Sequence, residues 1–311
     1  MQRILPRGEI EGLDHTAIPR VRMPVAASVF VDRAARLRHL ASDSAMADYL
    51  LLMAHLADGQ HRALKVFSAP KATEAQISRA QSHGMPPLQA MGTPRDPVWR
   101  EILQSLLDHM IAVPQVAAPA VVVFQDIKKR LQEDPASIEA MADALLAGDD
   151  HGVDAAVAPL LMAAMQVYWT GLACRFNDND LPVVSPFGVC PCCGSLPVSS
   201  VVRVGGPQDG CRYMSCSLCA TEWHMVRVTC SHCEDTKEIA YHSIEGGSEA
   251  IRAESCDHCH VYRKIFYQEK DLYVEPVADD LASIALDVLM GEAGYLRASG
   301  NPLLWQSTEQ A

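Results

Sequence analysis

The sequence predicts a mixed α and β protein with a helical N-terminal domain, two tandem four-cysteine modules of the rubredoxin-like or zinc-ribbon type, and a C-terminal helix. Three observations support this fold class. Apolar residues recur at helical spacing before residue 182, four Cys-x-x-Cys pairs lie between residues 190 and 259, and helical spacing returns after Pro276. The expected units are an N-terminal extended segment (1–25), a helical domain (26–182), a first four-cysteine module (183–228), a second four-cysteine module (229–275), and a C-terminal helix with a tail (276–311).

Apolar residues at helical spacing predict the helices of the N-terminal domain. They cover 26–40, a segment ending at Gly59, 97–112, 117–133, 137–147 and 154–174. Between the second and third of these, five prolines punctuate residues 68–97, which we expect to be a mobile surface element around a short helix at 73–82. The window 153–173 approaches the length of a membrane span, but Asp154, Pro159 and Gln166 interrupt it. We therefore expect a buried core helix there.

The four Cys-x-x-Cys pairs form a repeat, because adding 40 to the residue numbers of the first two pairs gives the last two. The pairs are Cys190/Cys193, Cys216/Cys219, Cys230/Cys233 and Cys256/Cys259. Two such pairs supply the four thiolates of a tetrahedral metal site, so the eight predict two metal ions. Neighbouring, interleaved and nested pairings are all possible. The repeat favours neighbours, in which each site encloses 22 residues, enough for a short hairpin.

Other uses of these cysteines fit the sequence less well. A thioredoxin-type redox dithiol needs one pair, and not four in a repeat. The first 25 residues lack an apolar run ending in a cleavage site, so we expect a cytoplasmic location, where thiols stay reduced. The cysteines outside the pairs are Cys174, Cys192 and Cys211, and no special role is expected for them.

Charge and motifs exclude several classes of function. The chain carries a formal charge of -12, and residues 186–275 hold 8 Lys/Arg against 12 Asp/Glu, so a phosphate backbone would be repelled. No P-loop, dinucleotide fingerprint or nucleophile elbow is present. A site closed by four thiolates leaves no position for water or substrate, so we expect no enzyme activity. The same donors suit zinc and iron, and the sequence does not choose between these metals.

Two further features lie near the cysteines. Five histidines cluster there, and we expect hydrogen bonds to sulfur or solvent exposure for them, and not metal ligation. They are His224, His232, His242, His258 and His260. Glu222 and Trp223 follow the second pair, where they are a candidate partner-binding anchor, with packing of Trp223 over the metal module as the alternative.

The C-terminal helix is predicted to pack on the metal modules and to fix their position. Its expected apolar stripe is Val277, Leu281, Ile284, Ala285, Val288 and Leu289. Asp279 and Asp280 lie where the positive end of the helix dipole is expected.

These features together resemble one family. The four cysteine pairs, the segment 216–227 and the tail from Asp279 through Asn301 and Pro302 resemble FdhE, the formate dehydrogenase accessory proteins of proteobacteria. The resemblance implies a cytoplasmic, non-catalytic maturation factor that binds the catalytic subunit of a respiratory formate dehydrogenase. It also implies rubredoxin-type iron bound by all eight paired cysteines. Cys192 is a third sulfur inside the first pair, and it leaves the fourth ligand of that site open.

Two rival classes of function remain. Thiolate-bound iron could make the chain an electron-transfer or redox-sensing protein, which would show charge-transfer bands that bleach on reduction. A zinc-ribbon nucleic-acid binder would hold its ligand at physiological salt. The sequence does not predict the oligomeric state, and it gives no sign of membrane insertion.

Overall fold

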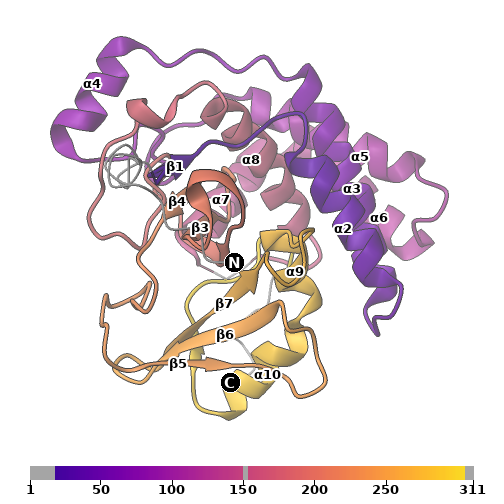
Figure 1. Cartoon of the computed structure of the whole chain (residues 1–311). Helices are drawn as coiled ribbons and strands as arrows, with labels where there is room; N and C mark the ends of the chain where they lie inside the picture. Colours follow the sequence, from indigo (N-terminus) through magenta and orange to yellow (C-terminus); the bar gives the residue numbers. More distant parts are fainter. Residues whose placement is uncertain (1–17, 150–152, 305–311) are drawn as a thin grey trace.

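The computed structural model describes residues 18–149 and 153–304. Most of the predicted N-terminal extended segment and the end of the predicted tail therefore lie outside the described residues. Figure 1 shows the helices α2 to α8 in the upper part of the molecule and the strands β5, β6 and β7 with α10 in the lower part, with α9 next to the helix α2. No helix among the described residues is both long enough and apolar enough to cross a membrane.

The helical part contains every helix predicted from apolar spacing. Its elements are α2 (Val29–Ala41), α3 (Ala47–Val66), α4 (Glu74–His83), α5 (Val98–Ala112), α6 (Ala118–Glu133), α7 (Pro135–Ala147) and α8 (Ala158–Ala173). The predicted end at Gly59 is wrong, because α3 continues to Val66. A Cβ at Gly59 would lie 2.8 Å from the ring of His109 on α5. Gly59 therefore permits close packing of two helices and does not end one.

Helix α8 forms the centre of this helical part. All its residues are buried, and it packs against α3, α5 and α7. The prediction of a buried core helix is confirmed. Its polar Gln166 is satisfied inside the core, since its side chain donates to the Ser217 carbonyl at 2.7 Å and accepts from Gln60 and Arg33. Gln166 thus connects the core helix to the first four-cysteine unit.

The two four-cysteine units share one sheet, which the sequence did not predict. The strands are β1 (Val21–Arg22), β2 (Pro197–Val202), β3 (Arg212–Cys216), β4 (Glu222–His224), β5 (Ile239–His242), β6 (Ile251–Cys256), β7 (Val261–Tyr267) and β8 (Leu296–Arg297). Their order is β1-β4-β3-β2-β7-β6-β5, with β8 beside β7. The hairpins β2–β3 and β5–β6 are the predicted ones, and the parallel pairing of β2 with β7 joins the two units.

The predicted C-terminal helix is interrupted at Ser283 into α9 (Pro276–Ala282) and α10 (Ile284–Glu292). The expected apolar stripe is correct in α9, where Val277 and Leu281 are buried. It is wrong in α10, where Val288 and Leu289 are exposed and Leu286 and Met290 are buried. Ser283 has a non-helical backbone conformation (φ -102°, ψ 33°), so the periodicity of α9 does not continue into α10. As predicted, α9 packs on the sheet at β2 and β7, and it also contacts α2.

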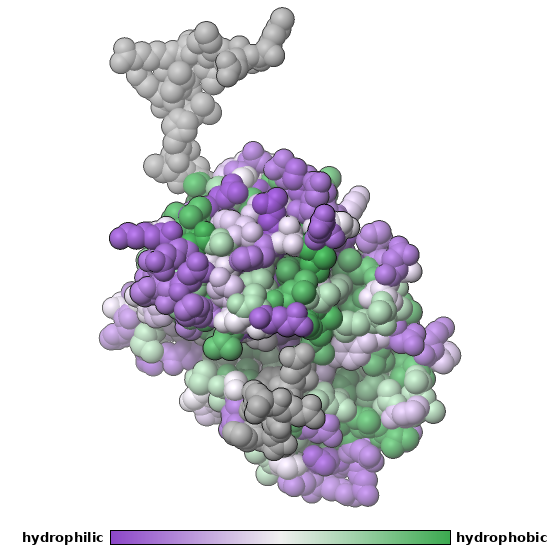
Figure 2. Space-filling model, turned by 90° about the horizontal axis from the view of Figure 1, so that it is seen from below, coloured by the Kyte–Doolittle hydropathy of each residue, from purple (hydrophilic) through white to green (hydrophobic). Residues whose placement is uncertain are grey.

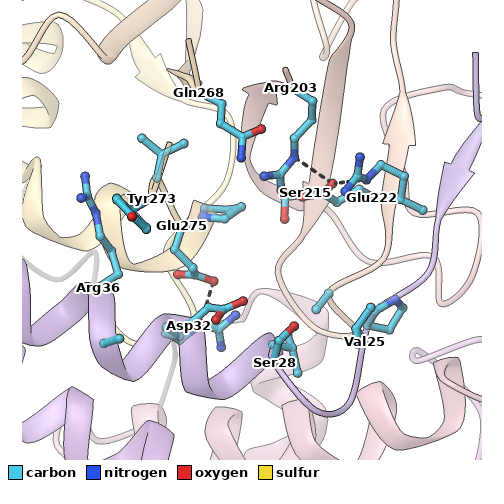
Figure 3. A pocket seen from close by; sticks show the side chains of 18 of the residues that line it. Val25, Ser28, Asp32, Arg36, Arg203, Ser215, Glu222, Gln268, Tyr273 and Glu275 are labelled. Atoms are coloured by element: carbon cyan, nitrogen blue, oxygen red, sulfur yellow. Dashed lines mark hydrogen bonds and ion pairs between the residues drawn. The ribbon is translucent and has the colours of Figure 1, made fainter. Parts of the chain in front are cut away.

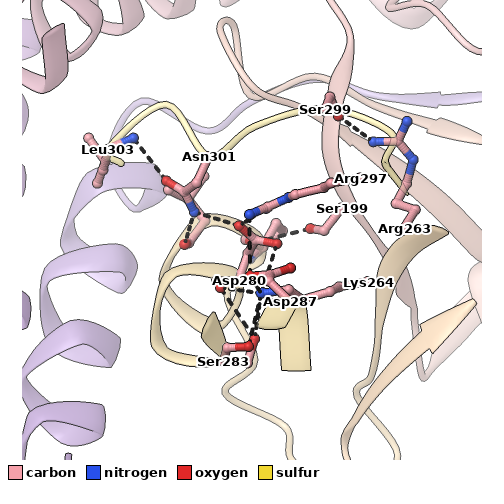
Figure 4. Close-up of polar contacts among 12 residues, drawn as sticks. Ser199, Arg263, Lys264, Asp280, Ser283, Asp287, Arg297, Ser299, Asn301 and Leu303 are labelled. Atoms are coloured by element: carbon pink, nitrogen blue, oxygen red, sulfur yellow. Dashed lines mark hydrogen bonds and ion pairs between the residues drawn. The ribbon is translucent and has the colours of Figure 1, made fainter. Parts of the chain in front are cut away.

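Buried ion pairs fix α9 between the helical part and the sheet. Toward α2, Asp279 accepts from both Arg36 Nε and Arg36 Nη2, and the latter bond is 2.6 Å long. Toward the sheet, the Lys264 ammonium lies 3.6 Å from Asp280 and 2.6 Å from Asp287. Arg297 pairs with Asp280 as well, and the Asn301 amide donates to the same carboxylate at 2.7 Å. Figure 4 shows these side chains converging on Asp280.

Replacing Asp280 by alanine is expected to destabilise the protein by about 3–5 kcal/mol, because Asp287 alone would then face both Lys264 and Arg297, which leaves one positive charge uncompensated in a buried site. Burial opposes ionisation of Asp280, but Lys264 and Arg297 outweigh it and lower the pKa of the carboxyl. Its contribution to stability is therefore complete above the unfolded pKa, about 3.9, and is lost as the pH falls through the lower folded pKa.

Denaturant unfolding at several pH values measures this effect. Asp271→Asn is the matched control, since Asp271 pairs with Arg36 at 2.7 Å but keeps 28% of its side chain exposed. We expect the control to cost about 1 kcal/mol or less. Equal losses in the two variants would contradict the assigned role of Asp280.

Candidate metal centres

The structure brings the eight paired cysteines together in two groups of four. One group is Cys190, Cys193, Cys216 and Cys219, and the other is Cys230, Cys233, Cys256 and Cys259. Within each group all four sulfur atoms lie within 4.8 Å of one another. The pairing of neighbours along the chain is confirmed. Each group could hold one metal ion.

The sulfur–sulfur distances suit a tetrahedral site. In the first group Cys190 and Cys219 lie 3.6 Å apart and Cys193 and Cys216 lie 3.4 Å apart. In the second group both corresponding distances are 3.7 Å. A tetrahedron with metal–sulfur bonds of about 2.3 Å has edges of about 3.8 Å. In each group these two distances therefore lie within a few tenths of an ångström of a tetrahedral edge, and no other sulfur–sulfur distance exceeds 4.8 Å.

The 40-residue repeat is also a repeat of backbone structure. Gly194 N–H donates to the Cys190 carbonyl at 2.9 Å, and Glu234 N–H donates to the Cys230 carbonyl at 3.0 Å. The residue after the second cysteine of every pair has a positive φ. These residues are Gly194 (79°), Ala220 (57°), Glu234 (64°) and His260 (54°). Of these four residues only Gly194 is of a type that adopts this conformation readily, because the other three have a Cβ.

These turns aim backbone amides at sulfur. The N–H groups of Leu218 and Cys219 donate to the Cys216 sulfur, both at 3.4 Å. In the second group, the N–H groups of His232 and Cys233 donate to the Cys230 sulfur at 3.4 and 3.5 Å. Hydrogen bonds to a charged acceptor are stronger than neutral ones, so these amides stabilise thiolates at the two sulfurs.

The pKa shifts of the cysteines in the first group favour one negative charge shared among its thiols. Burial raises the pKa of Cys190 and of Cys216 well above the usual value. Burial also opposes ionisation of Cys219, but hydrogen bonds from the neighbouring thiols outweigh it and the pKa of Cys219 falls well below the usual value. One thiolate among closely packed thiols is thus favoured, whereas four buried thiolates need a cation.

The proline-rich segment before α5 supports the first group. The Leu88 N–H donates to the Cys192 carbonyl at 2.9 Å, and the Ala90 N–H donates to the Cys193 carbonyl at 3.0 Å. Leu88 and Ala90 are themselves buried. The expectation of a mobile surface element is therefore wrong for these two residues, while the predicted short helix is confirmed as α4 with Thr73 as its N-cap.

The three unpaired cysteines lie outside both groups. Cys192 is fully buried beside the first group, where the neighbouring Cys219 thiol and burial raise its pKa. The group of four sulfurs at that site is complete without it. Cys174 follows α8, and its sulfur lies 3.4 Å from the Pro24 carbonyl. Cys211 lies in the β2–β3 loop, and its sulfur is 3.7 Å from the Asp209 carbonyl.

Glu222 and Trp223 face different environments, because successive residues of a strand point to opposite sides. Glu222 pairs with Arg203 and with Arg22 in a cleft of about 740 Å³ between the sheet and α2. Figure 3 shows Arg203 and Glu222 on one side of this cleft and Glu275 on the other. Trp223 donates to the Phe187 carbonyl at 2.8 Å beside a second cleft. The geometry favours separate roles for Glu222 and Trp223.

The five neighbouring histidines take different positions, and the groups of four contain none of them. His224 is half-buried against the Tyr213 ring, 5.8 Å between ring centroids, and His242 lies 2.8 Å from the Ser255 hydroxyl. His232, His258 and His260 are exposed around the second group.

A glycine and an arginine hold the two sites close together. A Cβ at Gly188, two residues before Cys190, would lie 2.5 Å from the carbonyl oxygen of Ser231, inside the second group. Arg263 on β7 donates to the Ser231 hydroxyl at 2.8 Å and to the Pro197 carbonyl of β2. Burial lowers the pKa of this arginine to about 9. Sequence reasoning missed both residues, since no local pattern marks a cross-sheet contact.

Comparisons with known proteins agree along the whole described length. Residues 18–185 match the family described as FdhE, N-terminal, residues 189–227 match the FdhE central domain, and residues 228–304 match the FdhE C-terminal domain. Protein FdhE homolog of Cronobacter sakazakii is 41% identical over 310 residues, and Protein FdhE of Escherichia coli is 40% identical over 312 residues. Each alignment covers 97% of this chain and 97% of the relative.

A solved structure is similar as well. The crystal structure of the FdhE protein from Pseudomonas aeruginosa matches with a TM-score of 0.78 and 36% sequence identity, covering 92% of this chain and 99% of the other. With the family matches and these relatives, the likeness in fold completes the case that the chain belongs to the FdhE family.

Proposed function

We propose that the protein is a cytoplasmic, non-catalytic accessory factor that binds the catalytic subunit of a respiratory formate dehydrogenase during maturation. The observation that carries this proposal is the pair of four-cysteine sites in a chain of the FdhE family. All eight paired cysteines are the proposed metal ligands. Iron is the proposed metal, because the family resemblance favours it.

The donor set supports a binding role and not hydrolysis. When bound, an ion would cross-link two hairpin ends at each site, and iron could in addition change its charge by one electron. Each group offers four sulfur atoms at tetrahedral spacing, which leaves no open position for a substrate. The backbone N–H groups at Cys216 and Cys230 would hold those thiolates in place. The protein's chemical contribution is then a fixed surface around the two sites.

An apolar cleft supports a protein partner. It has a volume of about 450 Å³, and Phe187, Pro191, Trp223 and Met225 are among the residues that line it. Exposed apolar side chains at its rim include Val183 and Val226, with 64% and 65% of their surface accessible. Figure 2 shows that hydrophobic residues also gather in the middle and on the right of one face of the molecule. Apolar surface of this kind favours protein contacts, and the negative charge of the chain disfavours nucleic acid.

An anaerobic pull-down combined with metal analysis tests this proposal. We expect the tagged protein to capture the catalytic subunit and to carry about two metal ions per chain, one for each group of four cysteines. Val226→Glu places a charge at the rim of the apolar cleft and is expected to weaken capture without changing the metal content. Asp126→Glu on α6 is a surface control. A folded protein that binds no metal, or that never captures the subunit, would contradict the proposal.

A further inference from the structure

The two four-cysteine sites have the same backbone but different residues between their cysteines. The first site reads Cys-Pro-Cys-Cys and Cys-Ser-Leu-Cys, and the second reads Cys-Ser-His-Cys and Cys-Asp-His-Cys. Under the 40-residue repeat, Cys192 corresponds to His232 and Leu218 corresponds to His258. Cys192 and Leu218 are buried, whereas His232 and His258 are exposed. Two apolar positions of the first site have thus become two surface imidazoles in the second.

The sulfur ligands of the second site are also less buried than those of the first. In the first site all four cysteines are buried, with at most 2% of their surface accessible. In the second site Cys230 and Cys256 are buried, but Cys233 and Cys259 are only partly so. One edge of the second tetrahedron therefore meets solvent. The first site has no such edge, since Leu88 and Ala90 bind the backbone of its first cysteine pair.

The two sites also differ in the charge of the residues around them. Residues 190–195 and 216–221 around the first site contain neither a charged residue nor a histidine. The corresponding residues around the second site contain three carboxylates, Glu234, Asp235 and Asp257, besides their histidines. Imidazole and carboxylate groups are common ligands of divalent metal ions, and negative charge raises the local concentration of cations. Within the described residues, neither the His232 nor the His258 imidazole makes a hydrogen bond, and His258 lies within electrostatic range of the Asp235 carboxylate.

We propose that the second site is where a divalent metal ion enters and leaves the protein, with His232 and His258 as transient ligands, while the first site retains its ion. This inference rests on the proposed function only in assuming that the eight cysteines bind metal. With an ion bound, an imidazole nitrogen of His232 or His258 would take the place of the Cys233 or Cys259 sulfur as a ligand. The thiolate set free would take up one proton from water and leave hydroxide, and no electron would be transferred.

The partly exposed edge explains why exchange begins there. A ligand can leave the ion only if solvent or another donor replaces it, and local opening is easiest where few contacts must be broken. At the first site the same step would require separating cysteines that belong to one hydrophobic core with the helix α8. A difference of about 1.4 kcal/mol in opening free energy corresponds to a tenfold difference in exchange rate.

Exchange of isotopically labelled zinc, followed by native mass spectrometry of the full-length zinc-loaded protein, tests the proposal. We expect one ion per chain to exchange at least about tenfold faster than the other. Alkylation with a chelator present, mapped by peptide mass spectrometry, is expected to modify Cys233 and Cys259 before any first-site cysteine. Equal exchange rates for the two ions, or earlier modification of Cys193 and Cys216, would overturn the assignment.

Variants test the two histidines. His232→Ala with His258→Ala is expected to slow the fast exchange about tenfold, while two ions per chain remain bound at equilibrium. His83→Ala, at the end of α4, is the matched control because it removes an exposed imidazole far along the chain from either site. If the faster-exchanging ion exchanged at the same rate in the double variant as in the original protein, the role of the histidines would be overturned. Failure of the proposed function is distinguishable, since it would appear as loss of subunit capture with both exchange phases intact.

Discussion

Replacing Cys193 by serine is expected to release the ion of the first site and to destabilise the first four-cysteine unit by about 10 kcal/mol, the scale of a structural four-ligand site. The sulfur of Cys193 lies 3.4 Å from that of Cys216, which ends β3. Strands β2 and β3 lie in the middle of the sheet, and β2 pairs directly with β7 of the second unit. Loss of the first site should therefore disturb both four-cysteine units.

Cys233→Ser is expected to have a more local effect. Its site closes the hairpin of β5 and β6, and β5 lies at the edge of the sheet. Hydrogen exchange of backbone amides, read with metal analysis, distinguishes the two variants. We expect Cys193→Ser to lose protection in β2, β3 and β7, and Cys233→Ser to lose it mainly in β5 and β6. In both variants the helices α3, α5 and α8 should stay protected.

Cys211→Ser is the matched control for both variants. Cys211 is a thiol in the β2–β3 loop and belongs to neither group of four sulfurs. We expect this change to leave the metal content at its original value and the stability within about 0.5 kcal/mol. If Cys193→Ser kept two ions and full amide protection, the first group would not be a structural metal site.

The parts of the fold that depend on local pattern were predictable from the sequence. Helical spacing located α2, α3 and α5 to α8, and the cysteine repeat indicated both the hairpins and the pairing of the four thiols. The predicted end of α3 was wrong, because Gly59 allows the close approach of His109 and does not end the helix. Such a contact joins residues far apart in the chain, and no local spacing reports it.

The arrangement of the units was not predictable for the same reason. Parallel pairing of β2 with β7 is a contact between two units of a repeat, and each unit alone carries no sign of it. Asp279 lies in the first turn of α9, as expected for the positive end of a helix dipole. The ion pairs that bury Asp279 and Asp280 against residues of α2, β7 and β8 were not predictable. The positive φ values at Ala220, Glu234 and His260 were also not predictable from the sequence, because these residue types seldom adopt that conformation.

Deleting the gene that encodes the protein is expected to abolish formate dehydrogenase activity in the host, while the catalytic subunit is still synthesised. The purified protein should not oxidise formate, because its two groups of four thiols leave no open metal position. Activity assays with immunoblots of the subunit measure both effects. Unchanged formate oxidation in a deletion strain without another accessory factor would make the assignment wrong.

Supplying the protein with zinc in place of iron distinguishes a structural role of the metal from a redox role. Zinc preserves tetrahedral coordination by four sulfur atoms and cannot undergo one-electron chemistry. The sulfur–sulfur distances of 3.4–3.7 Å accommodate either ion, so binding of the subunit should survive the replacement. If the zinc protein binds the subunit and restores activity in a cell-free maturation assay, the metal stabilises the binding surface. If it binds but restores nothing while the iron protein does, electron transfer at a thiolate site is part of maturation. Cys216→Ser and Cys256→Ser, each removing one ligand from a different site, then show which site is responsible.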